Sequence, residues 1–137
     1  MEDISLHILD IAENSIRANA RNLNIMLKED KKNDLLTLTI KDDGEGMDDQ
    51  TIEHALNPFF TTKKGKKVGL GLAFLSQSAE ETGGAMKIES EPGKGTKVIA
   101  TFSLGHIDRK PLGNLNETIR CLKFTHPELN ITFDHIK

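Results

Sequence analysis

Apolar residues recur at two different spacings in the first part of the chain. Over residues 4–20 isoleucines return at nearly helical spacing, which predicts a helix. Over 22–29 and 35–43 apolar and polar side chains alternate, which predicts two strands. The polar stretch KKND between them indicates the turn of a hairpin.

The same two patterns continue from residue 48 onwards. They predict two further helices and a second hairpin, whose turn is PGKG. Between the helices, residues 57–71 have no apolar period and are rich in glycine and lysine, which indicates a long mobile loop. The elements are expected at 48–56, 72–82, 85–91 and 96–104.

The last part of the chain adds one more helix and one more strand. After a connector, helical and alternating patterns are found at 116–124 and 130–136. A chain of 137 residues suits one compact domain. The order of elements predicts an α+β fold, a two-layer sandwich in which helices cover one face of a mixed β-sheet. Residues 105–137 are expected to be a C-terminal extension that packs on the same domain as residues 1–104.

Charge and cysteine content exclude several function classes. The 18 Lys and Arg residues against 21 Asp and Glu residues give a net charge of -3, so nothing favours nucleic acid or an anionic membrane as a partner. The single cysteine, Cys121, excludes an internal disulfide and a thiolate metal cage. The start of the chain is acidic, and no apolar run approaches the ~20 residues that span a bilayer. We therefore expect a cytoplasmic protein.

Three glycine clusters suggest a nucleotide site, although common motifs do not fit them. GEG at 44–46 and GLG at 69–71 both lack the third glycine of a dinucleotide-binding loop. GKG at 93–95 has no Ser or Thr after the lysine, so it is not a P-loop. Taken singly, these glycines are explained as turns.

Their order along the chain carries more information. ENSIRANA, DDGEGM, NPFFTTK, GLGLA and GKGTKV follow one another between residues 13 and 98. This series closely resembles the GHKL superfamily of ATP-binding domains, which includes type II topoisomerases, mismatch-repair ATPases and sensor histidine kinases. The resemblance covers roughly residues 4 to 104 and is nearest to the catalytic ATP-binding domain of histidine kinases. It implies a mixed sheet covered by helices on one face, with ATP bound between the helices and a flexible lid.

The resemblance assigns metal and base contacts to the first two boxes. Asn14 would bind Mg²⁺ through its amide oxygen, while Arg17, one turn further on, would reach a phosphate. Asp42 would accept a hydrogen bond from the amino group of adenine; guanine carries a carbonyl there, so adenine is selected. The other residues expected near the base are Gly44, Gly46, Met47 and Thr96. The acids expected to be solvated charges are Asp43, Glu45 and Asp48.

The third and fourth boxes would contact the phosphates. Backbone amides at the start of the helix after GLG would form an anion site, because helix N-termini bind anions. Residues 59–68 are expected to be a lid that orders around the γ-phosphate, although Lys67 stands where the family usually has glycine. The residues expected to contact nucleotide here are Phe59, Lys63, Gly69, Leu70, Gly71 and Leu72.

A carboxylate lies one helical turn before the magnesium residue. In hydrolysing GHKL members a glutamate occupies that position and activates a water, and here the residue is Asp10. Asp10 is therefore the candidate general base, or a group that supports the magnesium ion without binding it directly. The alternative is a helix carboxylate paired with Arg17 or His7. Glu13 lies about 100° around the helix from Asn14 and is expected to make a structural or partner contact.

Three function classes remain open. Because the first box begins near residue 4, we expect no helical hairpin with a phosphoacceptor histidine before it, and we expect His7 to be structural or site-lining. We therefore expect a stand-alone domain that binds ATP or ADP with Mg²⁺ and acts with a protein partner, either a phosphoacceptor or a regulated protein. The chain could phosphorylate a partner's histidine or serine, or hydrolyse ATP slowly. The alternative is a nucleotide-gated binding module without chemistry.

Overall fold

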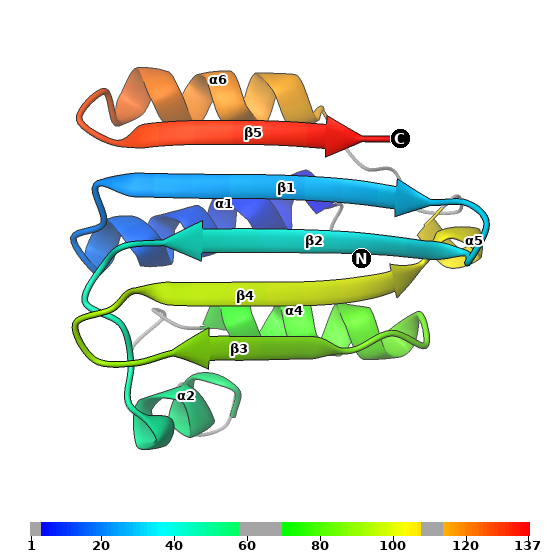
Figure 1. Cartoon of the computed structure of the whole chain (residues 1–137), viewed down its shortest axis with the longest axis horizontal. Helices are drawn as coiled ribbons and strands as arrows, with labels where there is room; N and C mark the ends of the chain where they lie inside the picture. The colour runs from blue at the N-terminus through cyan, green and yellow to red at the C-terminus, as the bar shows by residue number, and fades with distance from the viewer. Residues whose placement is uncertain (1–3, 58–69, 108–113) are drawn as a thin grey trace.

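A five-stranded mixed sheet with helices on one face organises the chain. The computed structural model describes residues 4–57, 70–107 and 114–137. The strand order is β3-β4-β2-β1-β5, and the β1–β5 pair is parallel whereas the other pairs are antiparallel. Helices α1, α4 and α6 lie together behind the sheet (Figure 1). The predicted α+β two-layer fold is confirmed.

The strands are β1 Asn22–Asp30, β2 Leu35–Asp42, β3 Met86–Ser90, β4 Thr96–Ser103 and β5 Asn130–Ile136. The helices are α1 Ile4–Arg17, α2 Asp49–Ala55, α4 Leu70–Glu81, α5 Leu104–Ile107 and α6 Leu115–Thr125.

Buried and exposed side chains alternate along the strands, so that one face of the sheet forms the hydrophobic core with the helices. Every second side chain of β1, β2 and β4 is buried against the helices, because successive residues of a strand point to opposite faces. Helix α1 buries a stripe with helical spacing toward the sheet, and α4 and α6 pack beside it. The largest fully buried apolar side chains are Ile8, Leu23, Ile25, Leu27, Leu36, Leu38, Ile40, Leu75, Phe102 and Leu122.

The largest differences from the sequence-based expectation concern two helix boundaries and one helix that was not predicted. Helix α1 ends at Arg17 rather than at residue 20, because Asn19 adopts a left-handed conformation with φ 62°. Helix α4 begins at Leu70, within the stretch that was expected to be loop. The short helix α5 was not predicted, since four residues carry no readable period.

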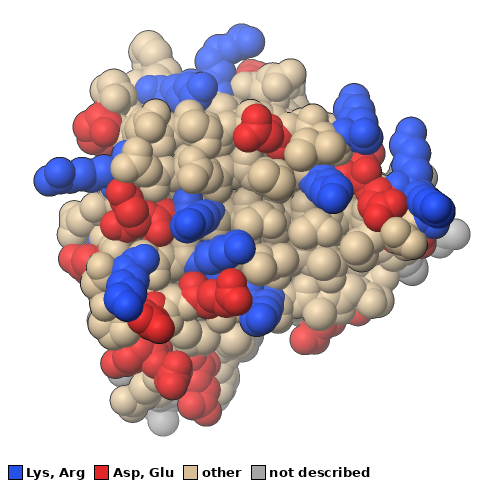
Figure 2. Space-filling view, in the orientation of Figure 1, with Lys and Arg blue, Asp and Glu red and all other residues tan. Residues whose placement is uncertain are grey.

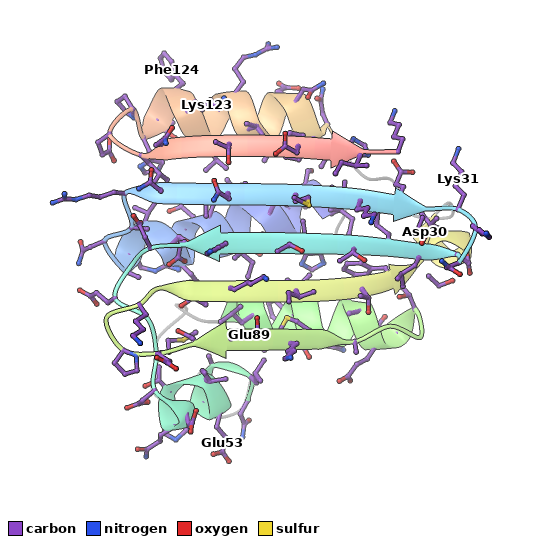
Figure 3. The ribbon with its side chains drawn as sticks, viewed as in Figure 1. Asp30, Lys31, Glu53, Glu89, Lys123 and Phe124 are labelled. Carbon is purple, nitrogen blue, oxygen red and sulfur yellow. The ribbon has the colours of Figure 1, made fainter. Side chains whose placement is uncertain are left out.

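The other face of the sheet carries scattered charges of both signs. Figure 2 shows this face with lysines and acidic residues interspersed rather than grouped. Glu89 of β3 projects from it, and Asp30 and Lys31 mark the β1–β2 turn (Figure 3). A half-solvated sheet face is typical of antiparallel sheets. Among the described residues, no helix is long and apolar enough to cross a membrane.

The C-terminal extension shares the core of the preceding residues. Strand β5 pairs with β1 in parallel, so that Ile131 lies beside Leu23. Helix α6 packs on α1 and on β5. The exposed side of α6 carries Lys123 and Phe124 at the outer edge of the molecule (Figure 3), and Phe124 is 85% exposed. The proposed division at residue 104 stays a prediction. The buried side chains that the extension contributes are Leu115, Ile119, Leu122, Leu129 and Ile131.

Three acids after β2 hold local structure rather than merely facing water. The Asp43 carboxylate accepts hydrogen bonds from the backbone N–H groups of Arg21 and Asn22 and from the Asn22 side chain, at 2.8 to 2.9 Å. Asp48 is the N-cap of α2 and accepts from the Thr51 amide at 2.7 Å, while Glu45 accepts from Asn19. Describing these acids only as solvated charges was therefore incomplete.

If the extension folds as one unit with the rest, damage to α6 should destabilise the whole protein. Replacing the buried Leu122 by Ala should lower the free energy of unfolding by about 2–5 kcal/mol, because a cavity is left in the shared core. The control Lys123→Ala, on the exposed side of the same helix, should change it by less than about 0.5 kcal/mol. Urea denaturation followed by circular dichroism should show one shifted transition. Two transitions, with one unmoved, would contradict a single folding unit.

The hydrogen bonds that the Asp43 carboxylate accepts from Arg21 and Asn22 predict that the stability of the fold depends on pH. Hydrogen bonds from Asn22 and Arg21 hold the pKa of Asp43 at about 2, below its usual 3.8. The pKa of Asp43 is lower in the folded state than in the unfolded state. The ionised carboxylate therefore stabilises the fold at pH values above 3.8, and this contribution is lost as the pH falls toward about 2. Asp43→Asn should therefore lose less stability on acidification than the wild type. Thermal unfolding across that range measures this, with Asp134→Asn on the open sheet face as control; equal pH profiles for all three proteins would refute it.

Candidate functional site

Polar residues end the buried stripes of three neighbouring strands. On β2 the buried positions Leu38 and Ile40 are followed, on the same face, by Asp42. In the sheet register Asp42 lies opposite Thr96 of β4, and Thr96 lies opposite Ser90 of β3. These three polar side chains form one row at the end of the sheet nearest the C-terminus of α1, which we call the polar end row. A row of this kind, at the margin of the core, is suited to reading a polar ligand.

Two donors from different segments hold the Asp42 carboxylate. The Ser15 hydroxyl of α1 donates to Asp42 Oδ2 at 2.6 Å, and the Gly44 amide donates to Oδ1 at 2.9 Å. Each carboxylate oxygen has lone pairs to spare after one bond. The arrangement therefore presents an oriented acceptor, which is the property required to bind an amino group.

Glycines let two turns approach the end of the sheet closely. Gly46 has φ 73°, and a side chain there would collide with the Glu91 backbone. Gly95 has φ 85°, and a side chain there would collide with the Asp42 carbonyl. A Cβ on Gly44 would lie 2.8 Å from the Ala18 carbonyl oxygen of the α1 C-terminus. Glycine is thus required at all three positions by protein packing, whether or not a base binds beneath them.

Ser90 joins the second hairpin to the segment after β2. Its hydroxyl accepts the Met47 amide hydrogen at 2.8 Å and donates to the Gly95 carbonyl at 2.8 Å. The Thr96 hydroxyl lies 2.9 Å from the same Ser90 oxygen. Met47 is partly buried against the core. Ser90 therefore fixes Met47 and Thr96, two residues expected near the base, relative to each other.

The end of α1 carries the amide and the guanidinium of the first box. Arg17 Nη2 donates to Asn14 Oδ1 at 2.6 Å, so the two side chains form one polar pair. Asn14 is partly buried and Arg17 is exposed. Ser15, between them in sequence, turns inward to Asp42, so this helix end borders the polar end row. Among the described residues no group of three His, Cys, Asp or Glu side chains could hold a metal ion by itself.

Asp10 lies beside the start of α4. A Cβ on Gly71 would lie only 2.9 Å from the Asp10 Cβ, so this glycine allows the first turn of α4 to pack on α1. The N-terminus of α4, with Leu70 and Leu72 in its first turn, therefore adjoins the helix that carries Asn14. Partial positive charge at a helix N-terminus favours a nearby anion. This geometry brings together Asp10 and the amides expected to contact phosphate.

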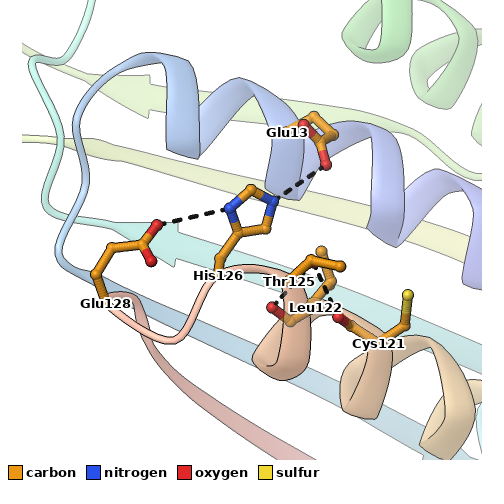
Figure 4. Close-up of polar contacts among 6 residues, drawn as sticks. All are labelled: Glu13, Cys121, Leu122, Thr125, His126 and Glu128. Carbon is orange, nitrogen blue, oxygen red and sulfur yellow. Dashed lines mark hydrogen bonds and ion pairs between the residues drawn. The ribbon is translucent and has the colours of Figure 1, made fainter.

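His7 and Glu13 are engaged in contacts within the protein. His7 is 2% exposed, and its Nε2 lies 3.1 Å from the Ser78 hydroxyl of α4, so it holds two helices together. Glu13 faces the C-terminal extension, where its carboxylate lies 3.7 Å from His126 Nε2 (Figure 4). The other ring nitrogen of His126 lies 3.6 Å from Glu128. Glu13 was expected to make a structural or partner contact, and in the structure its carboxylate lies near His126 of the same chain.

Some predicted residues lie outside the described part of the chain. These are Phe59, Lys63 and Gly69, together with the whole predicted lid over 59–68. Two residues of the described site were not predicted, Ser15 and Ser90. Ser90 continues the inward alternation of β3, which is a signal the sequence does contain. Ser15 has the register of a core position on α1, so its polar partner could not be inferred from spacing.

A depression of about 450 Å³ adjoins the polar end row. Asp42, Ser90 and Thr96 line it together with Ile52 of α2 and Ile88 of β3. Residues of the open sheet face also contribute to the lining, so the depression is open rather than enclosed. Asn14 and Arg17 are not among its lining residues, and it therefore covers only the part of the candidate site near Asp42.

Comparison with known proteins identifies sensor kinases as relatives. A putative sensor protein of Shewanella frigidimarina is 42% identical over 77 residues, which are 56% of this chain and 12% of that protein. The sensor protein kinase FleS of Pseudomonas aeruginosa is 36% identical over 111 residues, 80% of this chain and 27% of FleS. The sensor histidine kinase ZraS of Salmonella typhimurium is 35% identical over 89 residues, 64% of this chain and 19% of ZraS.

These matches concern only a part of each relative, since the chain covers between 12% and 27% of their lengths. A family profile covers most of the chain. The profile described as "Histidine kinase-, DNA gyrase B-, and HSP90-like ATPase" matches residues 2–106 of 137. That span includes the polar end row, the end of α1 and the start of α4. The chain therefore belongs to this ATPase family, as an ATP-binding domain of the histidine-kinase type.

Proposed function

We propose that this domain binds ATP with Mg²⁺ and transfers the γ-phosphoryl group to a partner protein. The observation that carries the proposal is the Asp42 carboxylate, held by Ser15 and Gly44 in the polar end row. As an oriented acceptor, it would bind the amino group of adenine. Met47 would pack on the base, with Gly44 and Gly46 beneath it, and Thr96 would support the contact from the neighbouring strand.

Phosphate binding is assigned to the C-terminal end of α1 and to the start of α4, which packs on α1 at Asp10. Arg17 would pair with a phosphate oxygen, and the first-turn amides of α4, around Leu70, Gly71 and Leu72, would donate to another. From outside the described residues, Lys63, Gly69 and Phe59 are proposed to complete the nucleotide contacts. Asn14 fits a magnesium ligand, because an amide oxygen is a hard neutral donor and ATP itself supplies negative charge. Asn14 would then exchange its bond from Arg17 for the ion, while Arg17 turns to phosphate. Bound Mg²⁺ would neutralise charge on the phosphates during transfer.

Transfer requires a nucleophile from the partner and a place for its proton. In the proposed reaction a partner histidine nitrogen or serine oxygen forms a bond to the γ-phosphorus while the bond to the ADP oxygen breaks, and ADP leaves. Asp10 is the proposed proton acceptor, since it lies one turn before Asn14 and beside the start of α4. The same carboxylate could activate water, which makes slow ATP hydrolysis the second candidate. A nucleotide-gated binding module is the alternative without chemistry.

Adenine selection can be tested at Asp42. The wild type should bind ATP and ADP with Mg²⁺ and discriminate against GTP, because a carboxylate cannot donate to the guanine carbonyl. Asp42→Asn replaces one acceptor with a donor and should weaken ATP binding by about 1–3 kcal/mol while narrowing the preference over GTP. Calorimetric titration measures both affinities, and Asp43→Asn, whose carboxylate faces β1, is the matched control. Equal affinity of the wild type for ATP and GTP would refute the assignment.

The role of Asp10 can be separated from that of Glu13 by kinetics. Asp10→Asn should reduce single-turnover ATP hydrolysis by about 100-fold or more, with nucleotide affinity nearly unchanged, because it removes the proton acceptor but not the binding groups. Glu13→Gln removes a similar charge on the same helix and should leave the rate close to that of the wild type. A rate lost only in Glu13→Gln would overturn the assignment. Unchanged rates in both variants would exclude Asp10 as the proton acceptor, and a wild type that binds ATP without any turnover, alone or with a partner, would favour the binding-module alternative.

A further inference from the structure

Ser15 is a polar residue at a position that packing would give to an apolar one. It is 1% exposed and lies on the buried side of α1, in helical register with the core positions Ile8 and Ile11. A buried hydroxyl without a good partner is unfavourable, so its partner matters. The hydroxyl oxygen lies 2.6 Å from Asp42 Oδ2 and 3.4 Å from the Ile11 carbonyl oxygen. Since a serine has one hydrogen to donate, the shorter contact, to the carboxylate, takes it.

The Ser15 bond completes the restraint on the Asp42 carboxylate. Gly44 donates to one oxygen from the turn that follows β2, and this contact spans only two residues of chain. Ser15 donates to the other oxygen from a different element, 27 positions away in sequence. A carboxylate bonded at one oxygen only can still swing about its side-chain torsions, whereas donors on both oxygens fix its plane.

We propose that Ser15 is a specificity-determining residue, which positions Asp42 to read the 6-amino group of adenine. The proposal rests on the function proposed above, in which Asp42 contacts the base. Ser15 itself need not touch the nucleotide, so it is a positioning residue. Its effect should appear only when the base carries the amino group that Asp42 binds.

The test compares two nucleotides that differ only in that amino group. ATP and purine riboside triphosphate, which has hydrogen in place of the 6-amino group, are titrated into the whole chain with Mg²⁺. The wild type should bind ATP at least roughly tenfold more tightly than the analogue, the value of one well-placed hydrogen bond to a charged group. Ser15→Ala should weaken ATP binding roughly tenfold and change analogue binding by less than about twofold.

Ser5→Ala is the matched control, because it removes another buried hydroxyl from α1, about 15 Å away along the helix axis. It should change neither affinity. Ser15→Cys keeps nearly the same volume with a much weaker donor, so it provides the same test with less change in packing if the alanine variant is unstable. It should show the same selective loss.

The outcomes separate this proposal from the one on which it rests. Equal losses of affinity for ATP and for the analogue in the Ser15 variants would mean that Ser15 has a merely structural role. No loss for either nucleotide would mean that it has no role. Both results overturn the proposal about Ser15, but neither contradicts the proposed function of the domain. A wild type that binds both nucleotides equally overturns the assignment of Asp42 as base reader, and Ser15 falls with it. A wild type that binds neither overturns the proposed function itself.

Discussion

The antiparallel register between β2 and β4 sets the position of the candidate base-binding residues on the sheet. It places Asp42 opposite Thr96, and the β3–β4 hairpin then places Ser90 opposite Thr96. Because side chains alternate between faces, a slip of one residue would move Asp42 to the open face and bury Lys41 in its place. The buried stripe of Leu36, Leu38 and Ile40 prevents such a slip. The packing of the core sets the register of the strands, and this register also sets the positions of the three side chains in the polar end row.

Close turn packing depends on the same register. The turn after β2 and the β3–β4 turn lie against each other, with the Gly93 amide donating to the Glu45 carbonyl at 2.6 Å. Gly46 and Gly95 permit this approach because they lack side chains and adopt positive φ. The Ser90 hydroxyl then links both turns through Met47 and Gly95. The end of the sheet is thus a preorganised surface, and preorganisation reduces the entropy lost when a ligand binds.

Helix α1 both packs against the core and places polar groups against several neighbouring segments, which explains its mixture of apolar and polar residues. Its inner side supplies core residues such as Ile8 and Ile11, and its polar groups are distributed among different neighbours. Asp10 adjoins α4, and Glu13 contacts His126 of the extension. Asn14 and Arg17 pair at the end that borders the polar end row. The polar residues that interrupt this helix are therefore explained by which neighbour each one faces, and only some of them are candidates for contact with nucleotide.

Apart from the short helix α5, the sequence by itself determined the kinds of elements, their order and the family, because helical and alternating periods are local and the glycine and acid boxes stand in a fixed order. It also indicated Asp42, Asn14 and Arg17, since each lies inside a box. The tertiary structure alone decided that β5 pairs in parallel with β1, that Asp43 clamps the start of β1 and that Ser15 reaches Asp42. These contacts join residues far apart in the chain or on different elements. A local pattern gives the face on which a side chain lies, but its partner is set by the order of strands and the packing of helices across the whole fold.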